Sequence, residues 1–317
     1  MSVRNIPVLI LNWNGWPDTI QCVCSVNENA PHPEIWVIEN GSTEDQSKIV
    51  LDKFPDTRII RLDRNYGWSG GYNRALQIAL DEGYQFAYLL NNDTVVQPGF
   101  LEKVATVASQ SPDIAAVGST MLFEGGEFVR FDGKYFSPGE KSAEKIERIP
   151  AEIDVPRVNG GGMLIRLDAF SRVGPFDERF FCYGEEEDWC DRAREQNGLR
   201  LKVARESFIE HRCGGSDISA NSHYYRVRNT FLNSGPSHPD ILTHARRQFW
   251  RIYCQRNDSP REVVRAMLCG VEDGMNRVFG PRNLRTPTLR SRCVLWAHTS
   301  FRFGQRMVGL AYSRVPR

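Results

Sequence analysis

The sequence predicts an α/β protein with a mainly parallel central sheet that is covered by helices on both faces. Over roughly the first 120 residues, short apolar runs alternate with amphipathic stretches, and this order is typical of βαβ units. The apolar runs that we expect to form strands are Val8–Asn12, Ile35–Glu39, Arg58–Leu62, Phe86–Leu90 and Ala115–Gly118. The helices expected between them are Trp16–Asn27, Glu44–Phe54, Ser69–Glu82 and Pro98–Ser109.

The chain beyond these units has a weaker periodicity. Residues 123–156 are rich in Gly, Glu and Lys, which indicates irregular strands and a loop. Three glycines, Gly160 to Gly162, then lead into an apolar run and predict a strand whose backbone approaches a ligand closely. A helix over Glu185–Gln196 and two short strands, Leu201–Ala204 and Ser207–His211, complete this region.

The charges are distributed unevenly along the chain. The formal net charge of the 317 residues is +1, but residues 246–317 contain 15 Arg, no Lys and four acidic residues. This tail therefore carries about +11 and the preceding residues about −10, which predicts contact with an anionic surface, either membrane headgroups or nucleic acid. We expect a first domain over residues 1–232 and a basic helical C-terminal region over residues 233–317, where Ser259–Glu262 form a capping box.

Other bulk properties favour a protein of the cytoplasm. No run approaches the roughly 18 apolar residues that a membrane-spanning helix requires. The N-terminus leads directly into the first expected strand and lacks a signal-peptide pattern. The eight cysteines show no metal-finger spacing, which favours reduced thiols over disulfides.

Short oxygen-bearing side chains follow the expected strand Phe86–Leu90. They are Asn91, Asn92, Asp93 and Thr94. Such residues lie at the carboxyl edge of a sheet, where open α/β folds bind ligands. Asp93 alone could cap the next helix, but a cap needs only one such group, so the cluster favours a ligand-facing edge. Oxygen ligands of this kind suit Mg²⁺ or Mn²⁺ better than zinc.

Four consecutive acidic residues, Glu185 to Asp188, form a second candidate site. They repel one another unless a cation, a proton or an acceptor hydroxyl lies among them. A solvated first helical turn, favoured by the helix dipole, would account for one or two of them. At helical spacing Glu185 and Asp188 share a face, whereas Glu186 and Glu187 point elsewhere. One of the four is therefore a candidate general base.

His211 ends the last expected strand and precedes a Gly-Gly-Ser segment. A lone histidine is more often structural, but imidazole is also a competent Mn²⁺ ligand. A cation held by Asp93 and His211, beside a separate carboxylate base, is what transfer from a diphosphate leaving group requires. The glycine-containing segment Asn65–Arg74 at a helix start could cradle a phosphate or form a plain tight turn.

In this order the segments resemble those of family 2 glycosyltransferases, and in particular their bacterial rhamnosyltransferase-like branch. The resemblance covers residues 6–232. The motifs that carry it are Leu11–Gly15, Val37–Thr43, Asn65–Arg74, Leu90–Thr94, Asn159–Ile165, Gly174–Phe181, Tyr183–Arg192, His211–Ser216 and Tyr224–Asn229.

The resemblance implies a GT-A fold and an inverting, metal-dependent transfer of a sugar from a nucleotide diphosphate donor. The expected donor is dTDP-L-rhamnose, with UDP-galactofuranose, UDP-galactose and UDP-glucose as alternatives, and the expected cofactor is Mn²⁺ or Mg²⁺. The acceptor would be a hydroxyl of a cell-envelope glycan or a lipid-linked acceptor. The Arg- and aromatic-rich segment Leu289–Tyr312 would then contact the inner face of the cytoplasmic membrane peripherally, or cap the enzyme.

The resemblance also assigns roles to individual residues. Glu186 matches the catalytic base, and Asp93 and His211 match the metal ligands. Residues expected to support the acceptor or the helix are Glu185, Asp188 and Trp189. Contacts with the nucleotide sugar are expected from Glu39, through the pyrimidine base, from Arg228, through the diphosphate, and from Asn14, Asn65, Gly70, Asn73 and Asn92.

The chain departs from the family pattern at three positions. Glu39 stands where relatives usually have Asp, which alters the geometry of base contacts. The metal motif Asn91–Asp93 contains one acid, which predicts a modest affinity for the metal. Glu186 stands where Asp is commoner, so the acceptor would lie one methylene further back.

Other classes of function remain open alternatives. A non-catalytic nucleotide-sugar-binding protein would keep the fold without turnover, although Asp93, Glu186 and His211 together favour an enzyme. Nucleic-acid binding through the arginine tail is disfavoured by the acidic remainder of the chain and by the lack of a nucleic-acid module, so no nucleic-acid partner is expected. A nucleotidyltransferase would leave the acidic run without a role.

Overall fold

The computed structural model describes residues 5–123, 128–131, 134–135, 150–212, 219–233 and 261–282. The chain divides into two compact units, Met1–Gly214 and Gly215–Arg317. The expected domain boundary at residue 232 stays a prediction. The segment Leu289–Tyr312, expected to contact a membrane or to cap the enzyme, lies outside the described residues, as do the first two residues of the capping box.

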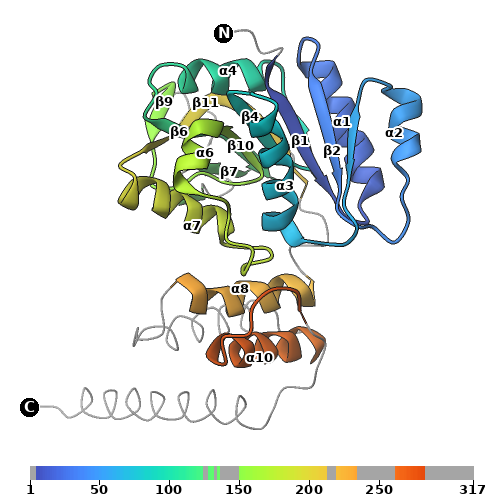
Figure 1. Cartoon of the computed structure of the whole chain (residues 1–317), viewed down its shortest axis with the longest axis vertical. Coiled ribbons are helices and arrows are strands. Elements are labelled where there is room, and N and C mark those ends of the chain that lie inside the picture. The colour runs from blue at the N-terminus through green and yellow to red at the C-terminus, as the bar shows by residue number, and fades with distance from the viewer. Residues whose placement is uncertain are drawn as a thin grey trace, which may run out of the picture. The chain divides into compact units, whose positions relative to one another are not determined.

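The first unit is built on one central sheet with the strand order β3-β2-β1-β4-β10-β6-β11-β5 (Figure 1). The strands of this path are β1 (Pro7–Asn12), β2 (Glu34–Glu39), β3 (Arg58–Arg61), β4 (Phe86–Asn91), β5 (Thr94–Val96), β6 (Ile114–Phe123), β10 (Gly162–Arg166) and β11 (Arg200–His211). Shorter strands at its margin are β7 (Phe128–Phe131), β8 (Lys134–Tyr135) and β9 (Glu152–Asp154). The predicted α/β class is therefore confirmed.

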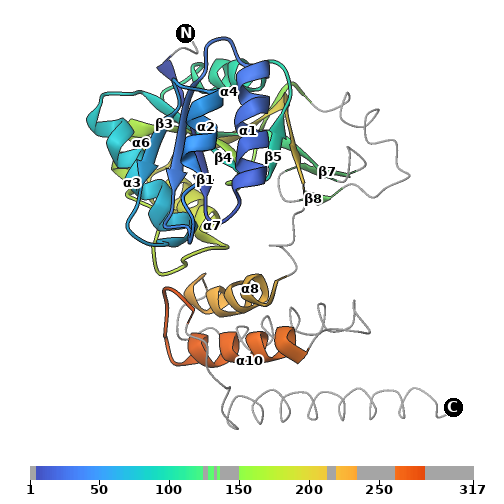
Figure 2. The same cartoon turned by 90° about the vertical axis from the view of Figure 1, so that its right-hand side faces the viewer.

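Helices cover both faces of this sheet, because its strands are apolar on both sides (Figure 2). One hydrophobic cluster joins the sheet to α1 (Trp16–Asn29), α2 (Ser47–Lys53) and α4 (Phe100–Ala108). A second cluster joins the opposite face to α3 (Gly67–Asp81), α6 (Leu167–Val173), α7 (Glu185–Asp191) and the π-helical turn η3 (Arg192–Gln196). The expected helix Glu185–Gln196 is thus α7 continued by a wider turn.

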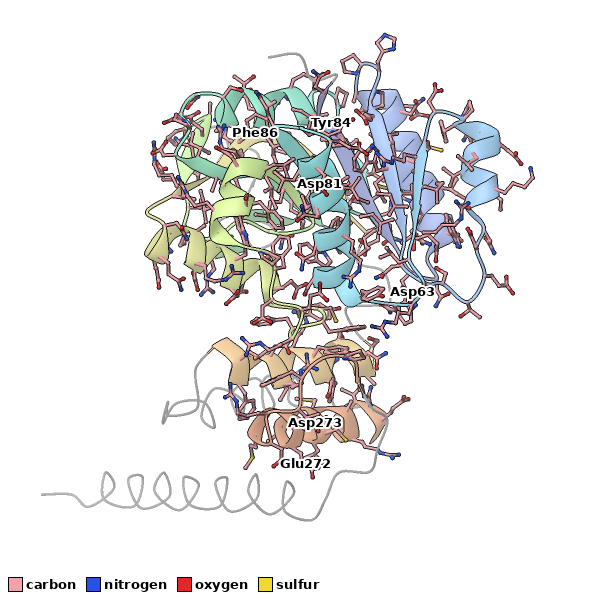
Figure 3. All side chains as sticks on the ribbon, viewed as in Figure 1. Asp63, Asp81, Tyr84, Phe86, Glu272 and Asp273 are labelled. Atoms are coloured by element: carbon pink, nitrogen blue, oxygen red, sulfur yellow. The ribbon has the colours of Figure 1, made fainter. Side chains whose placement is uncertain are left out.

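The strands β3, β2, β1 and β4 are parallel, so their carboxyl ends meet at one edge of the sheet. Asp63, just after β3, lies at this edge, and Phe86, at the start of β4, lies at the opposite one (Figure 3). Strand β10 is antiparallel to β4 and β6, with Gly162 opposite Leu90. The glycines before β10 therefore reach the carboxyl edge, where Asn91 N–H donates to the Gly161 carbonyl at 3.1 Å.

The sequence predicted two strands where the structure has one. Strand β11 runs without interruption from Arg200 to His211, and its register against β6 shifts between Ala204 and Phe208. A shift of this kind is a bulge, which hides the simple alternation of apolar residues. The three-residue strand β5 was not expected at all, and it pairs antiparallel with the end of β11, His211 opposite Thr94.

The start of α3 is locked against the loop before α7. The Phe181 carbonyl accepts hydrogen bonds from the N–H groups of Trp68, at 2.7 Å, and Ser69, at 3.4 Å. Two of the N–H groups at this helix start are therefore already used, and the segment Asn65–Arg74 is a packing junction. Gly67 has φ +72°, and a Cβ there would lie 2.1 Å from the Phe181 oxygen.

The second unit contains α8 (Ala220–Asn233) and α10 (Arg261–Met275). Five buried apolar residues join them: Val227, Phe231, Val263, Met267 and Val271. Glu272 and Asp273 lie on α10 (Figure 3), and the buried Asp273 carboxylate accepts a 2.6 Å hydrogen bond from Tyr224 Oη. In the part of the chain that the structure describes, no helix combines the length and the apolar character that crossing a bilayer demands.

Two glycines with similar positive φ test the packing of the start of α3 against Phe181. Gly67→Ala should lower the free energy of unfolding by about 2–4 kcal/mol, because positive φ and overpacking act together. Gly83, with φ +81° and no atom within 4 Å of its missing Cβ, is the matched control. Gly83→Ala should cost about 1 kcal/mol, from positive φ alone. The free energy of unfolding of both variants is measured by urea denaturation. Equal decreases would contradict the close packing of Gly67 against Phe181.

Candidate active site

The nucleotide end of the predicted site lies where β1 and β2 end. Glu39 is the last residue of β2 and is 4% exposed. Its carboxylate accepts hydrogen bonds from Asn12 Nδ2 at 2.7 Å, from Ser42 Oγ at 3.0 Å and from the Ser42 N–H. The carboxylate is therefore held in one orientation at the carboxyl edge of the sheet.

Asn14 and Asn65 use their side chains to shape the loops around Glu39. The exposed Asn14 has φ 57°, and its Oδ1 accepts from the Thr43 N–H at 2.8 Å. Asn65 Oδ1 accepts from the Gly67 N–H at 2.7 Å and from Asn40 Nδ2 at 3.1 Å. Both residues lie in loops at the carboxyl edge of the sheet, where β2 ends in Glu39. Their contacts with a nucleotide stay predictions.

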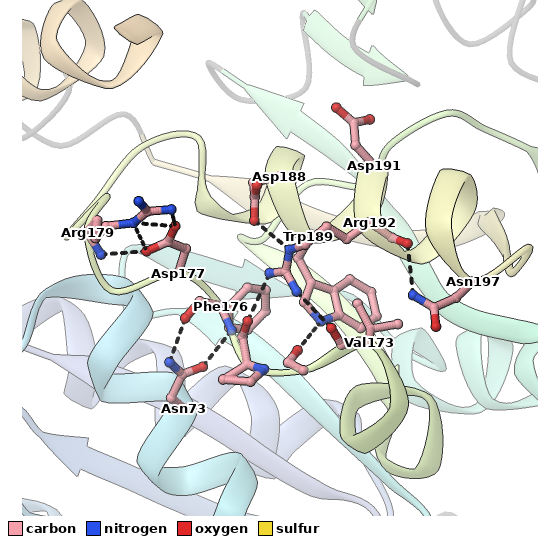
Figure 4. A network of polar contacts seen from close by, with 12 residues as sticks. Asn73, Val173, Phe176, Asp177, Arg179, Asp188, Trp189, Asp191, Arg192 and Asn197 are labelled. Carbon is pink, nitrogen blue, oxygen red and sulfur yellow. Dashed lines mark hydrogen bonds and ion pairs between the residues drawn. The ribbon is translucent and has the colours of Figure 1, made fainter. Parts of the chain in front are cut away.

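Gly70 and Asn73 lie inside α3 rather than at its tip. Gly70 is buried, and a Cβ there would lie 2.8 Å from the Tyr66 Cβ. Asn73 exchanges two 2.9 Å hydrogen bonds with the backbone of Phe176, its Nδ2 donating and its Oδ1 accepting (Figure 4). Asn73 thus joins α3 to the loop after α6, and the expected place of both residues in the nucleotide cleft stays a prediction.

Asp93 and His211 lie next to each other although they are far apart in the sequence. Asp93 lies in the tight turn between β4 and β5, and His211 ends β11. Pairing of β5 with β11 brings His211 Nε2 to 3.4 Å from Asp93 Oδ1, with the two side chains 11% and 15% exposed. A carboxylate oxygen and an imidazole nitrogen at this separation fit two positions around a divalent cation.

The two residues would leave most of the coordination sphere to other groups. Among the residues that the structure describes, no cluster of three His, Cys, Asp or Glu side chains is placed to hold a metal. One carboxylate beside an imidazole fits Mn²⁺ or Mg²⁺ at a phosphate-transfer site, since Mg²⁺ typically takes one or two carboxylates and shares its remaining positions between substrate phosphates and water.

Asn92 turns away from Asp93 toward α1. Its Nδ2 donates to Thr19 Oγ1 at 3.0 Å and to the Gly15 carbonyl at 3.2 Å. The predicted contact of Asn92 with the donor stays a prediction. Its evident structural effect is to attach the β4–β5 turn to the N-terminal end of α1.

The acidic residues of α7 occupy different environments. Glu187 forms a 2.5 Å ion pair with Arg157. Asp188 forms a 2.8 Å ion pair with Arg192, which Figure 4 shows. Trp189 is buried, and its Nε1 donates to the Gly174 carbonyl at 3.0 Å. These contacts anchor α7 from two sides.

Glu186 borders the carboxyl edge of the sheet. It is partly exposed, and its Cβ lies 3.4 Å from the position that a Cβ on Gly160 would take. The Trp68 ring lies against the same glycine, at 2.6 Å from that position, and Trp68 Nε1 donates to Asn91 Oδ1 at 3.2 Å. Glu186 is thus connected through Gly160 and Trp68 to the end of β4.

Trp68 is a residue of this site that the sequence did not single out. The only available signal was the run of glycines before β10, because a close approach by a large ring requires a residue without a side chain. The indole also packs on Tyr72 and Phe176, with ring centroids 4.5 and 5.0 Å apart. It therefore joins α3, the end of β4 and the glycine segment.

Glu185 is 3% exposed, and its Oε2 has no hydrogen-bond partner among the described atoms. Burial, together with the negative charge of Glu186, raises the pKa of the Glu185 carboxyl well above its usual 4.5. A buried carboxyl of this kind retains its proton to a higher pH than an exposed one.

Arg228, the expected diphosphate contact, is fully buried within the second unit. Its Nε donates to Asn229 Oδ1 at 2.9 Å, and Nη1 donates to the Gly280 carbonyl. The guanidinium also lies over the rings of Tyr224 and Tyr225, at 5.5 and 4.8 Å from their centroids. The expected contact stays a prediction, and it would require this side chain to leave these partners.

The pKa of Glu185 predicts how stability depends on pH. Because the folded chain holds a proton that the unfolded chain releases above about pH 4.5, the free energy of unfolding falls as the pH rises toward the folded pKa. The fall from this one group is at most about 1.4 kcal/mol per pH unit. Glu185→Gln has no proton to lose, so its loss of stability between pH 5 and 7 should be smaller than that of the wild type.

Urea denaturation at pH 5 and pH 7 measures this difference. Glu195→Gln is the matched control, because Glu195 is an exposed glutamate of the adjoining η3 turn. It should leave the pH dependence of the wild type unchanged. The same pH dependence in wild type and Glu185→Gln would show that the buried carboxyl does not titrate as described.

Comparisons with known proteins identify the family of the chain. The sequence model of glycosyl transferase family 2 matches residues 8–174. The chain is 24% identical, over 244 residues, to the N-acetylglucosaminyl-diphospho-decaprenol L-rhamnosyltransferase of Mycobacterium tuberculosis H37Rv, covering 69% of this chain and 80% of that protein. It is 23% identical to the dTDP-rhamnosyl transferase RfbF of Shigella flexneri, covering 66% of this chain and 74% of the relative.

A solved structure confirms the fold class. The crystal structure of GalNAc-T7 with UDP, GalNAc and Mn²⁺ superposes with a TM-score of 0.57 at 17% sequence identity. The match covers 86% of this chain and 56% of that chain, and at this identity it concerns the fold alone. Since the family model covers more than half of the sequence, the protein belongs to glycosyl transferase family 2 and is a glycosyltransferase.

Proposed function

We propose that the protein is an inverting, divalent-metal-dependent transferase that moves L-rhamnose from dTDP-L-rhamnose to a hydroxyl group. The acceptor is a cell-envelope glycan or a lipid-linked acceptor. The observation that carries the proposal is the pair Asp93 and His211, 3.4 Å apart at the carboxyl edge of the sheet, with Glu186 on a separate element. The names of the two rhamnosyltransferase relatives support the choice of sugar.

Different residues are suited to bind the two ends of the donor. Glu39, fixed by Asn12 and Ser42, is suited to the nucleobase end. Asp93 and His211 are suited to hold Mn²⁺ or Mg²⁺ at the diphosphate end. When bound, such a cation would act as a Lewis acid on the diphosphate oxygens and offset the charge of the departing nucleotide.

The chemical step needs one base and no covalent intermediate. Glu186 accepts the proton of the acceptor hydroxyl as that oxygen bonds to the anomeric carbon from the face opposite the diphosphate. The bond from the anomeric carbon to the diphosphate oxygen breaks, and its electron pair leaves with the nucleoside diphosphate. A single displacement inverts the anomeric configuration.

A UDP-sugar donor is the second candidate, with galactofuranose, galactose or glucose as the sugar. This alternative follows from the same family resemblance, since other members of the family use UDP-sugars. The mechanism and the roles of Asp93, His211 and Glu186 are the same for both donors. Peripheral membrane contact through the arginine-rich tail, from the cytoplasmic side, is a further part of the proposal.

A donor screen tests the metal site and the choice of sugar together. Mn²⁺-dependent binding is measured for dTDP-rhamnose, UDP-galactofuranose, UDP-galactose and UDP-glucose. We expect dTDP-rhamnose to bind most tightly, and Asp93→Ala to weaken that binding at least tenfold, because it removes one ligand of the cation. Asp56→Ala, at an exposed aspartate of the loop before β3, should bind as the wild type does.

The outcomes of the screen separate the candidates. Preference for a UDP-sugar would keep the mechanism and overturn the choice of rhamnose. Absence of metal-dependent binding by every donor would overturn the proposed metal-dependent mechanism.

Glu186→Gln tests the proposed base separately. Loss of a general base should lower kcat by about 10²- to 10⁴-fold while the donor dissociation constant stays within about twofold. The neighbouring Glu187→Gln, whose carboxylate pairs with Arg157, is the matched control and should retain most of the turnover. Equal turnover of the wild type and Glu186→Gln would remove Glu186 from the mechanism.

A further inference from the structure

Helix α1 presents three small polar residues to the strand segment that carries Asp93. Thr19, Cys22 and Ser25 are spaced three apart, so they share one face of the helix. Their exposed fractions are 0%, 0% and 5%. In a helix that packs on a sheet, this face would ordinarily be apolar, so buried polar groups here require partners.

Two of the three residues attach to the strand backbone. Ser25 Oγ accepts from the Val96 N–H at 3.2 Å. Cys22 Sγ lies 3.6 Å from the Asn91 carbonyl, to which it donates, and 3.8 Å from Thr94 Oγ1. Burial raises the pKa of the Cys22 thiol to about 12, so it stays protonated and remains a donor.

Thr19 is the centre of a side-chain network. Its hydroxyl lies 2.8 Å from Asn12 Oδ1 and 2.9 Å from the Gly15 carbonyl, either of which can accept its proton. The same oxygen accepts from Asn92 Nδ2 at 3.0 Å. Asn12, in turn, donates to Glu39 at 2.7 Å. A chain of hydrogen bonds thus runs from Glu39 through Asn12 and Thr19 to the β4–β5 turn.

We propose that Thr19 is a positioning residue, whose buried hydroxyl fixes the turn carrying Asp93 relative to Glu39. The inference rests on the proposed function, because it concerns the residues proposed to bind the two ends of one donor, Glu39 at the nucleobase and Asp93 at the diphosphate. A hydroxyl both donates and accepts, so it can join two amides that face each other. A valine of the same shape does neither, and it would leave Asn12 and Asn92 without this connection.

A substitution at Gly15 would disturb the same turn from a second position. A Cβ at residue 15 would lie 2.6 Å from Asn92 Nδ2, closer than two such atoms can approach. The backbone at Gly15 has φ −115°, which any residue can adopt. Gly15→Ala should therefore displace the Asn92 amide without straining its own backbone, and so disturb the network from the other side.

The binding of Mn²⁺ itself reports the position of Asp93 without any turnover. The full chain is titrated with Mn²⁺ in the presence of dTDP, and in parallel with UDP, while free Mn²⁺ is followed by electron paramagnetic resonance. Thr19→Val should weaken Mn²⁺ binding about tenfold. Thr19→Ser keeps the hydroxyl and should bind within about twofold of the wild type. Gly15→Ala should weaken binding as Thr19→Val does.

Ser222→Ala is the control for a merely structural effect. Ser222 is also buried, at 1% exposed, and its hydroxyl donates to the Ser219 carbonyl at 2.8 Å, but it belongs to the second unit and lies outside the network. It should lower thermal stability while Mn²⁺ binding stays unchanged. Wild-type Mn²⁺ binding in both Thr19→Val and Gly15→Ala would overturn the positioning role and leave the proposed function intact. No nucleotide-dependent Mn²⁺ binding in the wild type would overturn the proposed function, and this inference with it.

Discussion

The geometry of the site depends on the pairing of β5 with the end of β11. His211 lies opposite Thr94, and the adjacent Asp93 is thereby brought within 3.4 Å of the imidazole. Side chains alternate between the two faces of a strand, so a slip by one residue would turn His211 to the other side. The register of β11 against β6 also shifts between Ala204 and Phe208, before His211 is reached, so the face on which His211 lies depends on this irregularity as well. The candidate metal pair therefore exists only in the observed register.

The other supports of the site are polar contacts made inside the first unit. Helix α1 holds the β4–β5 turn through Thr19, while Trp68 connects the end of β4 to the glycine segment beside Glu186. Each of these contacts is at least partly buried, and an unpaired amide or hydroxyl there would cost about 1–3 kcal/mol. This cost favours one arrangement of the edge over alternatives with similar apolar packing.

The sequence predicted the parallel half of the fold well, because each strand from Val8 to Leu90 is a short apolar run between amphipathic helices. It failed where the signal is not local. β5 has three residues, too few for a pattern, and the bulge in β11 broke the alternation that would have shown one strand. The hydrogen bonds from Trp68 and Ser69 to the Phe181 carbonyl join residues more than a hundred positions apart, so the sequence could not show that these N–H groups have a partner in the protein.

The acidic run of α7 shows the same limit at the level of single side chains. The four acids are nearly indistinguishable in the sequence, yet each has its own surroundings in the fold. Glu185 is enclosed, Glu187 and Asp188 form ion pairs with Arg157 and Arg192, and Glu186 borders Gly160. Two of these neighbours, Arg157 and Gly160, come from the segment before β10, far from α7 in the chain. Which acid faces the carboxyl edge is therefore decided by tertiary contacts, and the choice of Glu186 had to come from the family resemblance.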